Sequence, residues 1–218
     1  PIFHKLIKNK YNLRTPLIIL NIGGIANLTS IDSNEKIQSR DIGPGNCLID
    51  QWIRMNSKMK YDKDGKIAMS GEINKKILKK TLEKLSVKTK GKYLNTSFDV
   101  KDFDISFVKG LSLEDGAATL TECTSKIIKD EELFSLLDLN NVIISGGGRK
   151  NKFLIKRIEE KFSNKLKLID DLGIDGDFVE SQAFAYLAIR SYLKLPISFP
   201  ETTGCLRPCT GGAIVEAK

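Results

Sequence analysis

The sequence predicts an α/β fold built on a mixed β-sheet, and two observations lead to this prediction. In the second half of the chain, a buried-type strand is followed by three glycines, a helix, a second strand and a further helix, which is the pattern of an α/β protein. In the first half, a glycine pair joins two apolar runs as in a β-hairpin. The sheet is therefore expected to contain antiparallel as well as parallel strands.

The hairpin is predicted to consist of residues 18–22 and 27–31, turning through Gly23 and Gly24. Residues 41–46, Asp-Ile-Gly-Pro-Gly-Asn, are predicted to form a turn because glycine and proline dominate them. A helix is expected next, since apolar residues recur at spacings of three and four: Leu48, Ile49, Trp52 and Met55. Asn46 stands where it would cap this helix.

The middle of the chain is predicted to be mainly helical. Asp62-x-Asp64-Gly65 resembles the start of a calcium-binding loop, but Ile73 occupies the position where that loop needs glutamate, so calcium is rejected. Residues 74–85 form a lysine-rich amphipathic pattern, residues 88–107 show no clear period, and residues 113–128 are expected to form a helix.

In the second half, residues 142–145 are predicted to be a buried strand, residues 151–162 a helix and residues 166–169 a short strand. Asp177 and Glu180 have the spacing of a capping box, which predicts a helix running to about Leu193. Its apolar face is expected to comprise Ala183, Phe184, Leu187 and Ala188. Prolines end this helical region, and the tail that follows is expected to lie on the surface.

Composition and charge exclude several classes of protein. Of the 218 residues, 41% are hydrophobic and 28% charged, which is typical of one large or two small globular domains rather than of a disordered or membrane protein. No apolar run approaches the ~20 residues that cross a membrane, and residues 1–14 do not resemble a signal peptide. The net charge of +8 is spread over short lysine clusters without interleaved aromatic residues, which argues against nucleic-acid binding.

The four cysteines and the single histidine do not predict a metal centre. Cys205 and Cys209 form the one close pair, and a pair does not complete a four-ligand zinc site. The remaining cysteines are interpreted as small buried residues in a reducing compartment, which favours a cytoplasmic protein.

Gly146, Gly147 and Gly148 follow a predicted strand and precede a predicted helix. That context favours nucleotide binding by backbone N–H groups at a helix N-terminus. The run is not G-x-G-x-x-G, because Asn151 stands at the last glycine position, and it is not a P-loop. A tight turn without a ligand is the alternative interpretation.

Three other features are candidates for chemistry. Gly23 and Gly24, followed by Asn27, are compatible either with a hairpin that embraces phosphate or with a plain glycine hairpin. Asp41, before the Gly-Pro-Gly turn, is suited to a general base or to a magnesium contact, or is simply a turn-initiating residue. Glu180 is either a substrate contact near a positive helix end or only a capping residue.

Taken together, six segments in order resemble the anhydro-N-acetylmuramic acid kinase family over nearly the whole chain. They are residues 21–27 (Asn-Ile-Gly-Gly-Ile-Ala-Asn), 41–46, 61–65 (Tyr-Asp-x-Asp-Gly), 118–122 (Ala-Thr-Leu-Thr-Glu), 145–151 (Ser-Gly-Gly-Gly with Asn151) and 180–188 (Glu-Ser-Gln-Ala-Phe-Ala-Tyr-Leu-Ala). The chain departs from the family at Ile42, where threonine is usual, and at Ser181-Gln182, where Ala-Met is common.

The resemblance implies a ribonuclease-H-like lobe of the actin–hexokinase–heat-shock ATPase type, with ATP and Mg²⁺ as cofactors. It implies phosphorylation of 1,6-anhydro-N-acetylmuramic acid with hydrolytic ring opening, giving N-acetylmuramic acid 6-phosphate and ADP in cell-wall recycling. By position, Asp41 matches the catalytic base and Glu180, Gly43 and Asn46 match substrate contacts. The nucleotide-side matches are Gly23, Gly24 and Asn27 in the second phosphate hairpin, and Gly146, Gly147, Gly148 and Asn151 in the adenosine loop.

The resemblance also implies that residues 1–218 form the C-terminal portion of a two-lobe kinase, with the N-terminal lobe largely missing. The family's first phosphate loop, of the type Gly-Thr-Ser-x-Asp-Gly, does not occur in this sequence. A homodimer, or pairing with a separate N-terminal fragment, is the expected assembly. The alternatives are an inactive remnant of such a kinase and a kinase of the same superfamily that acts on another sugar.

Overall fold

The computed structural model describes residues 1–90, 98–131, 134, 141–162, 166–213 and 215. Five strands form one sheet in the order β3-β2-β1-β4-β5. Their bounds are Leu17–Ile22 (β1), Ile25–Ile31 (β2), Ile37–Pro44 (β3), Val142–Ser145 (β4) and Lys167–Leu168 (β5). β1 pairs antiparallel with β2 and β2 with β3, whereas β4 runs parallel to both β1 and β5. The predicted mixed sheet is confirmed, and its strand order and directions are ribonuclease-H-like.

The α-helices are α1 (Ile2–Lys10), α2 (Cys47–Asn56), α3 (Lys66–Ser70), α4 (Lys75–Lys90), α5 (Leu113–Lys129), α7 (Lys152–Glu159), α8 (Val179–Tyr192) and α9 (Pro200–Thr203). Short 3₁₀ turns are Lys63–Gly65 (η1), Val100–Asp102 (η2), Ser106–Val108 (η3), Gly147–Lys150 (η4) and Ile169–Leu172 (η5). The part of residues 88–107 that falls at 91–97 lies outside the described residues.

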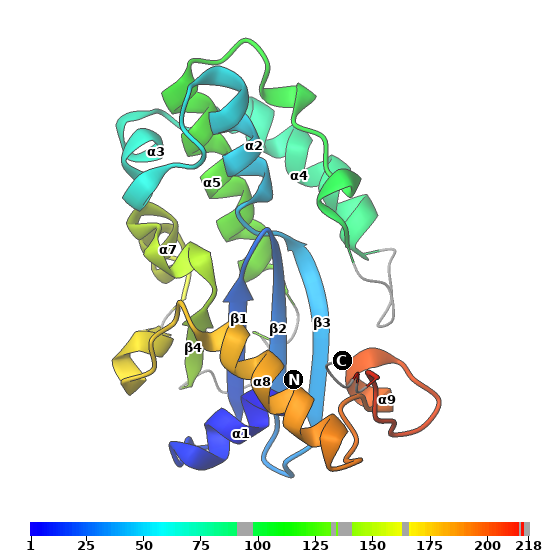
Figure 1. Cartoon of the computed structure of the whole chain (residues 1–218). Helices are drawn as coiled ribbons and strands as arrows, with labels where there is room; N and C mark the ends of the chain where they lie inside the picture. Colours follow the sequence, from blue (N-terminus) through cyan, green and yellow to red (C-terminus); the bar gives the residue numbers. More distant parts are fainter. Residues whose placement is uncertain (91–97, 132–133, 135–140, 163–165, 214, 216–218) are drawn as a thin grey trace.

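Helices cover both faces of the sheet (Figure 1). One apolar cluster joins β1, β2 and β4 to α5 and α7, with Leu20, Ile22, Ile144, Leu154 and Ile158 at its centre. A second cluster, on the opposite face, joins the sheet to α1 and α8. Successive side chains of a strand point to opposite faces, and β1, which is buried at five of its six positions, supplies apolar residues to both clusters.

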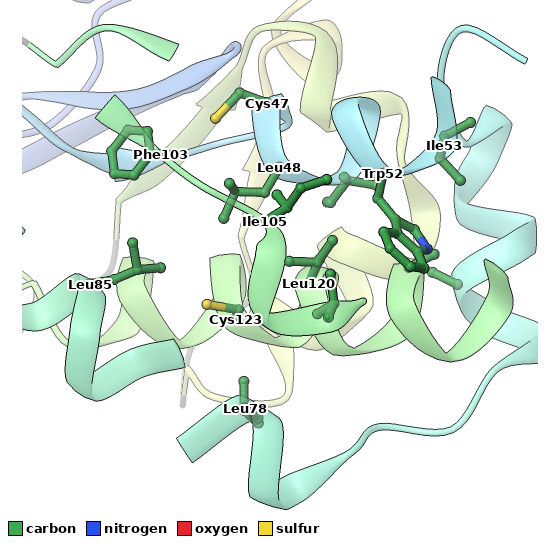
Figure 2. Close-up of a cluster of buried hydrophobic side chains, with 14 residues drawn as sticks. Cys47, Leu48, Trp52, Ile53, Leu78, Leu85, Phe103, Ile105, Leu120 and Cys123 are labelled. Carbon is green, nitrogen blue, oxygen red and sulfur yellow. The ribbon is translucent and has the colours of Figure 1, made fainter. Parts of the chain in front are cut away.

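A third cluster lies beyond the end of the sheet, where α2, α3 and α4 pack around the N-terminal half of α5 (Figures 1 and 2). Trp52 of α2 lies in close contact with α5, because its Nε1 donates to the carbonyl of Leu113 at 2.9 Å. A Cβ at Gly116 would lie 2.3 Å from the indole ring, so glycine permits this crossing. Burial raises the pKa of Cys47 to about 11 and that of Cys123 to about 12, which fits the interpretation of these thiols as buried, unreactive residues.

α5 and α7 are joined by a buried carboxylate. Glu122 of α5 accepts hydrogen bonds from Arg157 at 2.7 Å and from Lys161 at 3.0 Å. Burial alone would raise the pKa of Glu122, but these two cations outweigh it and lower the pKa. This ion pair fixes the helix that follows the second glycine loop.

The predicted turn at residues 41–46 is partly wrong, because β3 continues through Pro44. The backbone of this segment pairs with β2, Gly43 lying opposite Ala26 and Pro44 opposite Ile25. Since β3 is the outermost strand on this side of the sheet, a proline without an N–H group is tolerated there. The turn is limited to Gly45 and Asn46, and α2 begins at Cys47. In the part of the chain that the structure describes, no helix has the length and apolar character needed to cross a membrane.

Candidate functional site

A row of polar side chains crosses four strands at the end of the sheet that carries the glycine loops. Asn21 of β1 lies opposite Asn27 of β2 and beside Ser145 of β4, and Asn27 lies opposite Asp41 of β3. Residues paired in this way project from the same face of a sheet. Asp41, Asn27, Asn21 and Ser145 therefore form one line, on the face that α1 and α8 cover farther down (Figure 1).

The regular register of β2 and β3, which runs unbroken from the Ile31–Ile37 pair to Asn27, puts Asp41 into this line. Directly after Asp41 a β-bulge shifts the pairing and leaves Ile42 without a partner, and Ile42 lies in the apolar cluster on the other face. One oxygen of Asp41 accepts a hydrogen bond from the backbone N–H of Phe98 at 2.9 Å. Within the described residues Asp41 forms no ion pair, so its second oxygen is available for a ligand.

The turn after β3 is bonded to the first glycine loop. The N–H groups of Gly45 and Asn46 donate to the carbonyls of Gly24 and Gly23 at 2.9 and 2.8 Å. Asn46 is the N-cap of α2 by position, but its side chain does not cap the helix; its Nδ2 donates to the carbonyl of Ile22 at 3.3 Å. The expected cap is therefore wrong, and the amide instead attaches the turn to the hairpin.

Packing requires some of the predicted site glycines and not others. A Cβ at Gly146 would lie 2.6 Å from Asn21 Oδ1, and one at Gly148 would lie 2.4 Å from Ile22 Cγ2. At Gly24 the nearest atom would be 3.6 Å away, and at Gly147 nothing lies within 4 Å. Close packing within the protein explains Gly146 and Gly148, Gly24 has room for a Cβ in ordinary contact with Val100, and Gly147 leaves open space beside the backbone.

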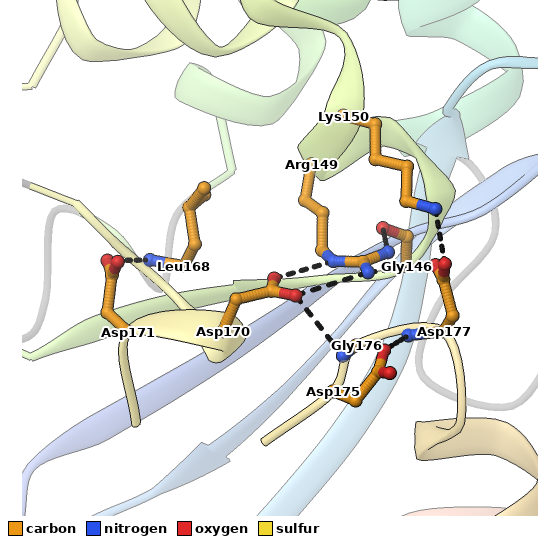
Figure 3. Close-up of polar contacts among 9 residues, drawn as sticks. All are labelled: Gly146, Arg149, Lys150, Leu168, Asp170, Asp171, Asp175, Gly176 and Asp177. Atoms are coloured by element: carbon orange, nitrogen blue, oxygen red, sulfur yellow. Dashed lines mark hydrogen bonds and ion pairs between the residues drawn. The ribbon is translucent and has the colours of Figure 1, made fainter. Parts of the chain in front are cut away.

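The second glycine loop follows β4 as predicted, turns through η4 and leads into α7. Asn151 caps that helix, since its Oδ1 accepts from the N–H of Leu154 at 2.9 Å. Arg149 donates to the carbonyl of Gly146 and to the carboxylates of Asp170 and Asp177 (Figure 3). The buried guanidinium of Arg149 thus binds the first residue of the loop, and Asn151 ties its last residue to α7.

The predicted capping box at the start of α8 is wrong. The N-cap residue is Phe178, no side chain caps the helix, and Asp177 binds Arg149 and Lys150 instead. Glu180 lies in the first turn with an exposed side chain. The segment before α8 is attached to the second glycine loop through Asp177, and Glu180 itself forms no hydrogen bond or ion pair with the other predicted site residues in the described part of the chain.

The predicted apolar face of α8 is also wrong in part. Val179, Ala183 and Tyr186 pack toward the sheet, while Phe184 and Ala188 are exposed. The helix is apolar on both sides, so its sequence does not indicate which side is buried. Its outward surface carries large apolar side chains, with Phe184 65% and Ile189 58% exposed.

Of the predicted site residues, the structure brings Asp41, Gly43, Asn46, Gly23, Gly24 and Asn27 together around the hairpin end of the sheet. Gly43 is buried within β3, and Gly146–Gly148 lie at the end of the neighbouring β4. Sequence reasoning did not identify Asn21, Ser145 or Arg149. Polar residues at the ends of two otherwise apolar strands were the available signal for the first two. Among the described residues, no group of three or more His, Cys, Asp or Glu side chains is arranged to hold a metal ion.

The sequence matches the family model described as "Anhydro-N-acetylmuramic acid kinase" over residues 1–217. It is 48% identical over 224 residues to the anhydro-N-acetylmuramic acid kinase of Pelagibacter ubique, covering 99% of this chain and 59% of that protein. It is 37% identical over 215 residues to the protein of the same name from Zymomonas mobilis, covering 98% of this chain and 58% of that protein. The chain thus spans a little over half the length of these curated relatives.

Among solved structures, the chain is similar to an activator of 2-hydroxyisocaproyl-CoA dehydratase from Clostridium difficile with bound ADPNP. The TM-score is 0.47 at 14% identity, and the match covers 80% of this chain and 63% of the other. So distant a similarity adds nothing to the site. The family match over residues 1–217, together with the relatives' identities, establishes that this chain belongs to the anhydro-N-acetylmuramic acid kinase family.

Proposed function

We propose that this chain carries the catalytic base and the nucleotide loops of a kinase that phosphorylates 1,6-anhydro-N-acetylmuramic acid with ATP and opens its anhydro ring with water. The products are N-acetylmuramic acid 6-phosphate and ADP, formed in the cytoplasm. One observation supports this most directly: Asp41 stands in a row of polar side chains at the sheet end that carries both glycine loops.

The chemistry needs a base and a phosphate site side by side. Asp41 takes a proton from water as that water attacks C1, the C1–O6 bond breaks, and O6 accepts the γ-phosphoryl group of ATP. A carboxylate with one oxygen held by the Phe98 N–H and the other unbound is suited to orient such a water. Transfer of the phosphoryl group depends mainly on positioning, for which backbone N–H groups at Gly23–Gly24 and Gly146–Gly148 are suited.

Magnesium fits this site as a companion of the nucleotide. Mg²⁺ usually keeps several waters and takes one or two carboxylates together with phosphate oxygens. The described residues offer no three-residue acidic cluster, so in this proposal the phosphates supply most of the ligands, with Asp41 as a carboxylate at the same end of the sheet. The ion supplies charge neutralisation when bound. Glu180, Gly43 and Asn46 are assigned to the sugar, and Asn27 and Asn151 to the nucleotide side.

The chain spans 59% of the Pelagibacter ubique relative. In this proposal full activity requires the rest of that length, to which we assign the first phosphate loop. The exposed apolar surface of α8, next to Glu180, supports this division, because large exposed apolar patches usually mark an interaction site. The first alternative is an inactive remnant of such a kinase, which would show no turnover even after the missing region is supplied. A kinase for another sugar is the second alternative, which a panel of N-acetylglucosamine, glucose and acetate tests.

The test uses Asp41→Asn with Asp32→Asn as its matched control. Asp32 lies at the opposite end of the β2–β3 hairpin, where its carboxylate accepts backbone bonds that asparagine also forms. Calorimetry should show that both variants of the 218-residue chain bind ATP as the wild type does. In enzyme reconstituted with the missing region, Asp41→Asn should lower kcat by about 10³-fold, in the range of a lost general base, and Asp32→Asn should not.

Two results would contradict the proposal. Turnover by Asp41→Asn at the rate of the control would exclude Asp41 as the base. Failure of the wild-type chain to bind ATP would exclude the nucleotide loops. Turnover by the 218-residue chain alone would instead show that activity does not require the part of the relatives' length that this chain does not span.

A further inference from the structure

Arg149 is a buried cation that lies between the second glycine loop and the segment leading into α8. The proposed function assigns the loop to the nucleotide and Glu180, at the start of α8, to the sugar. Its side chain is 4% exposed. Nε donates to Asp170 Oδ2 at 2.7 Å and Nη2 to Asp170 Oδ1 at 3.3 Å, which makes a two-pronged ion pair. Nη1 donates to the carbonyl of Gly146 at 3.1 Å, and Nη2 also donates to Asp177 Oδ1 at 2.8 Å.

These acceptors come from three separate segments, as Figure 3 shows. Gly146 opens the second glycine loop, Asp170 lies in η5 after β5, and Asp177 comes two residues before the first residue of α8. The chain between the last two passes directly against the guanidinium: a Cβ at Gly176 would lie 2.2 Å from Arg149 Nε. The Gly176 N–H also donates to Asp170 Oδ1 at 3.3 Å. One guanidinium therefore holds the glycine loop and the approach to α8 together.

The start of α8 has few other attachments. No side chain caps the helix, and Val179 is its one fully buried residue. Lys150 also contacts Asp177, but both side chains are more than half exposed. Such an exposed pair contributes little to stability. The orientation of the first turn of α8, and of Glu180 within it, accordingly depends on the contact between Asp177 and Arg149 together with the packing of Val179 against the sheet.

We propose that Arg149 is a positioning residue that links the two sides of the site: a nucleotide bound at Gly146–Gly148 fixes the guanidinium, and the guanidinium fixes the start of α8 and thereby Glu180. This inference rests on the proposed function, since it assigns the glycine loop to a nucleotide and Glu180 to the sugar. Arg149 itself touches neither ligand.

Hydrogen exchange read by mass spectrometry, on the 218-residue chain with and without ADP and Mg²⁺, tests the link. In the wild type, ADP should slow exchange in residues 146–151 and also in residues 178–183. Asp177→Asn should keep the first protection and lose the second. Lys150→Ala, which removes the other contact to Asp177, should keep both. Arg149→Lys, which keeps the charge but loses the two-pronged geometry, should weaken ADP binding about tenfold, a typical coupling between two sites, because the glycine loop that the guanidinium holds is then less ordered before binding.

The outcomes separate this inference from the proposed function. Absence of ADP protection in the wild type would exclude the proposed function and this inference with it. Protection of both segments in Asp177→Asn would exclude the inference alone. Loss of α8 protection in Lys150→Ala as well would assign the attachment to the exposed pair and would equally overturn the role of Arg149. If Arg149 has a merely structural role, the variants should melt at lower temperature, but ADP should then protect residues 146–151 and 178–183 to the same relative extent in Asp177→Asn as in the wild type.

Discussion

The loop at Gly23–Gly24 and the loop at Gly146–Gly148 lie at the ends of two neighbouring strands, β1 and β4, yet different kinds of contact hold them. The first is held by backbone hydrogen bonds, from the N–H groups of Gly45 and Asn46 to its carbonyls. The second is held by side chains, chiefly the Arg149 guanidinium and the cap at Asn151. Ion pairs between side chains respond to changes of charge and of pH, whereas hydrogen bonds between backbone groups do not titrate.

The largest expected effect concerns an added atom at Gly45, in the turn whose backbone is bonded to the first loop. In Gly45→Ala the new Cβ would lie 2.4 Å from the carbonyl oxygen of Gly23, and neither backbone can move without breaking the bonds between them. We expect a loss of about 3 kcal/mol in the free energy of unfolding, the upper part of the overpacking range, and a fall of roughly 6–12 °C in Tm. Urea denaturation measures it.

Gly147→Ala is the control for that substitution, because nothing lies within 4 Å of its Cβ. Its free energy of unfolding should change by less than about 0.5 kcal/mol, as for other surface substitutions. Its nucleotide affinity should nevertheless fall, since the vacant space is assigned to the ligand. Equal stability losses in the two variants would show that the contacts met by the new Cβ do not decide the loss.

The next effect concerns the anchor of α7 behind the second loop. Glu122→Ala removes a carboxylate that is 5% exposed and leaves Arg157 and Lys161 without it. Breaking a buried pair costs 3–5 kcal/mol when the remaining charge is fully buried, and because these cations are partly exposed we expect about 2 kcal/mol. Thermal unfolding measures it.

Glu160→Ala is the matched control, because Glu160 binds the same guanidinium from a side chain that is 41% exposed. It should cost less than about 0.5 kcal/mol, as an exposed ion pair does. A loss in Glu160→Ala as large as that in Glu122→Ala would mean that burial of the carboxylate is not what anchors α7.

The third prediction is that acid loosens the second loop before the first. The hydrogen bond from Arg149 lowers the pKa of Asp170, and hydrogen bonds from Lys150 and Arg149 lower the pKa of Asp177. A carboxylate whose pKa is lowered on folding stabilises the fold above its unfolded pKa of about 3.9, and this stabilisation is lost as the pH falls through the folded value. The backbone hydrogen bonds that hold the first loop involve no titratable group, so they do not weaken over this pH range.

Amide exchange between pH 6 and pH 3, corrected for the intrinsic effect of pH, checks this difference. Protection of residues 146–151 should begin to fall near pH 4, while protection of residues 22–26 and 45–47 should persist to lower pH. Loss of both protections over the same pH range would show that the two loops open as one unit.

The sequence predicted elements whose signals are local. The strand at 142–145 is found at the predicted residues, since a short apolar run before three glycines has few other interpretations. The strand β3 was missed, because Ile-Gln-Ser-Arg-Asp-Ile-Gly-Pro has no apolar alternation. Asp177 was predicted to cap α8 because it stands three residues before Glu180. Sequence spacing does not show that the fold brings Arg149 within hydrogen-bond distance of its carboxylate. The row from Asp41 to Ser145 depends on strand register, which the sequence does not display.

The smallest expected effect compares two asparagines that precede a helix: Asn46, which is bonded to the first loop, and Asn151, which follows the second. Asn151 accepts the Leu154 N–H at 2.9 Å and is a true cap, so Asn151→Ala should cost about 1 kcal/mol. Asn46 has helical backbone angles, φ −81° and ψ −14°, and caps nothing; it has only the 3.3 Å bond from Nδ2 to Ile22. Asn46→Ala should therefore cost only a few tenths of a kcal/mol, as a long neutral hydrogen bond would. Urea denaturation of both variants resolves the difference, and a cost at Asn46 equal to that at Asn151 would mean that a side chain also holds the first loop.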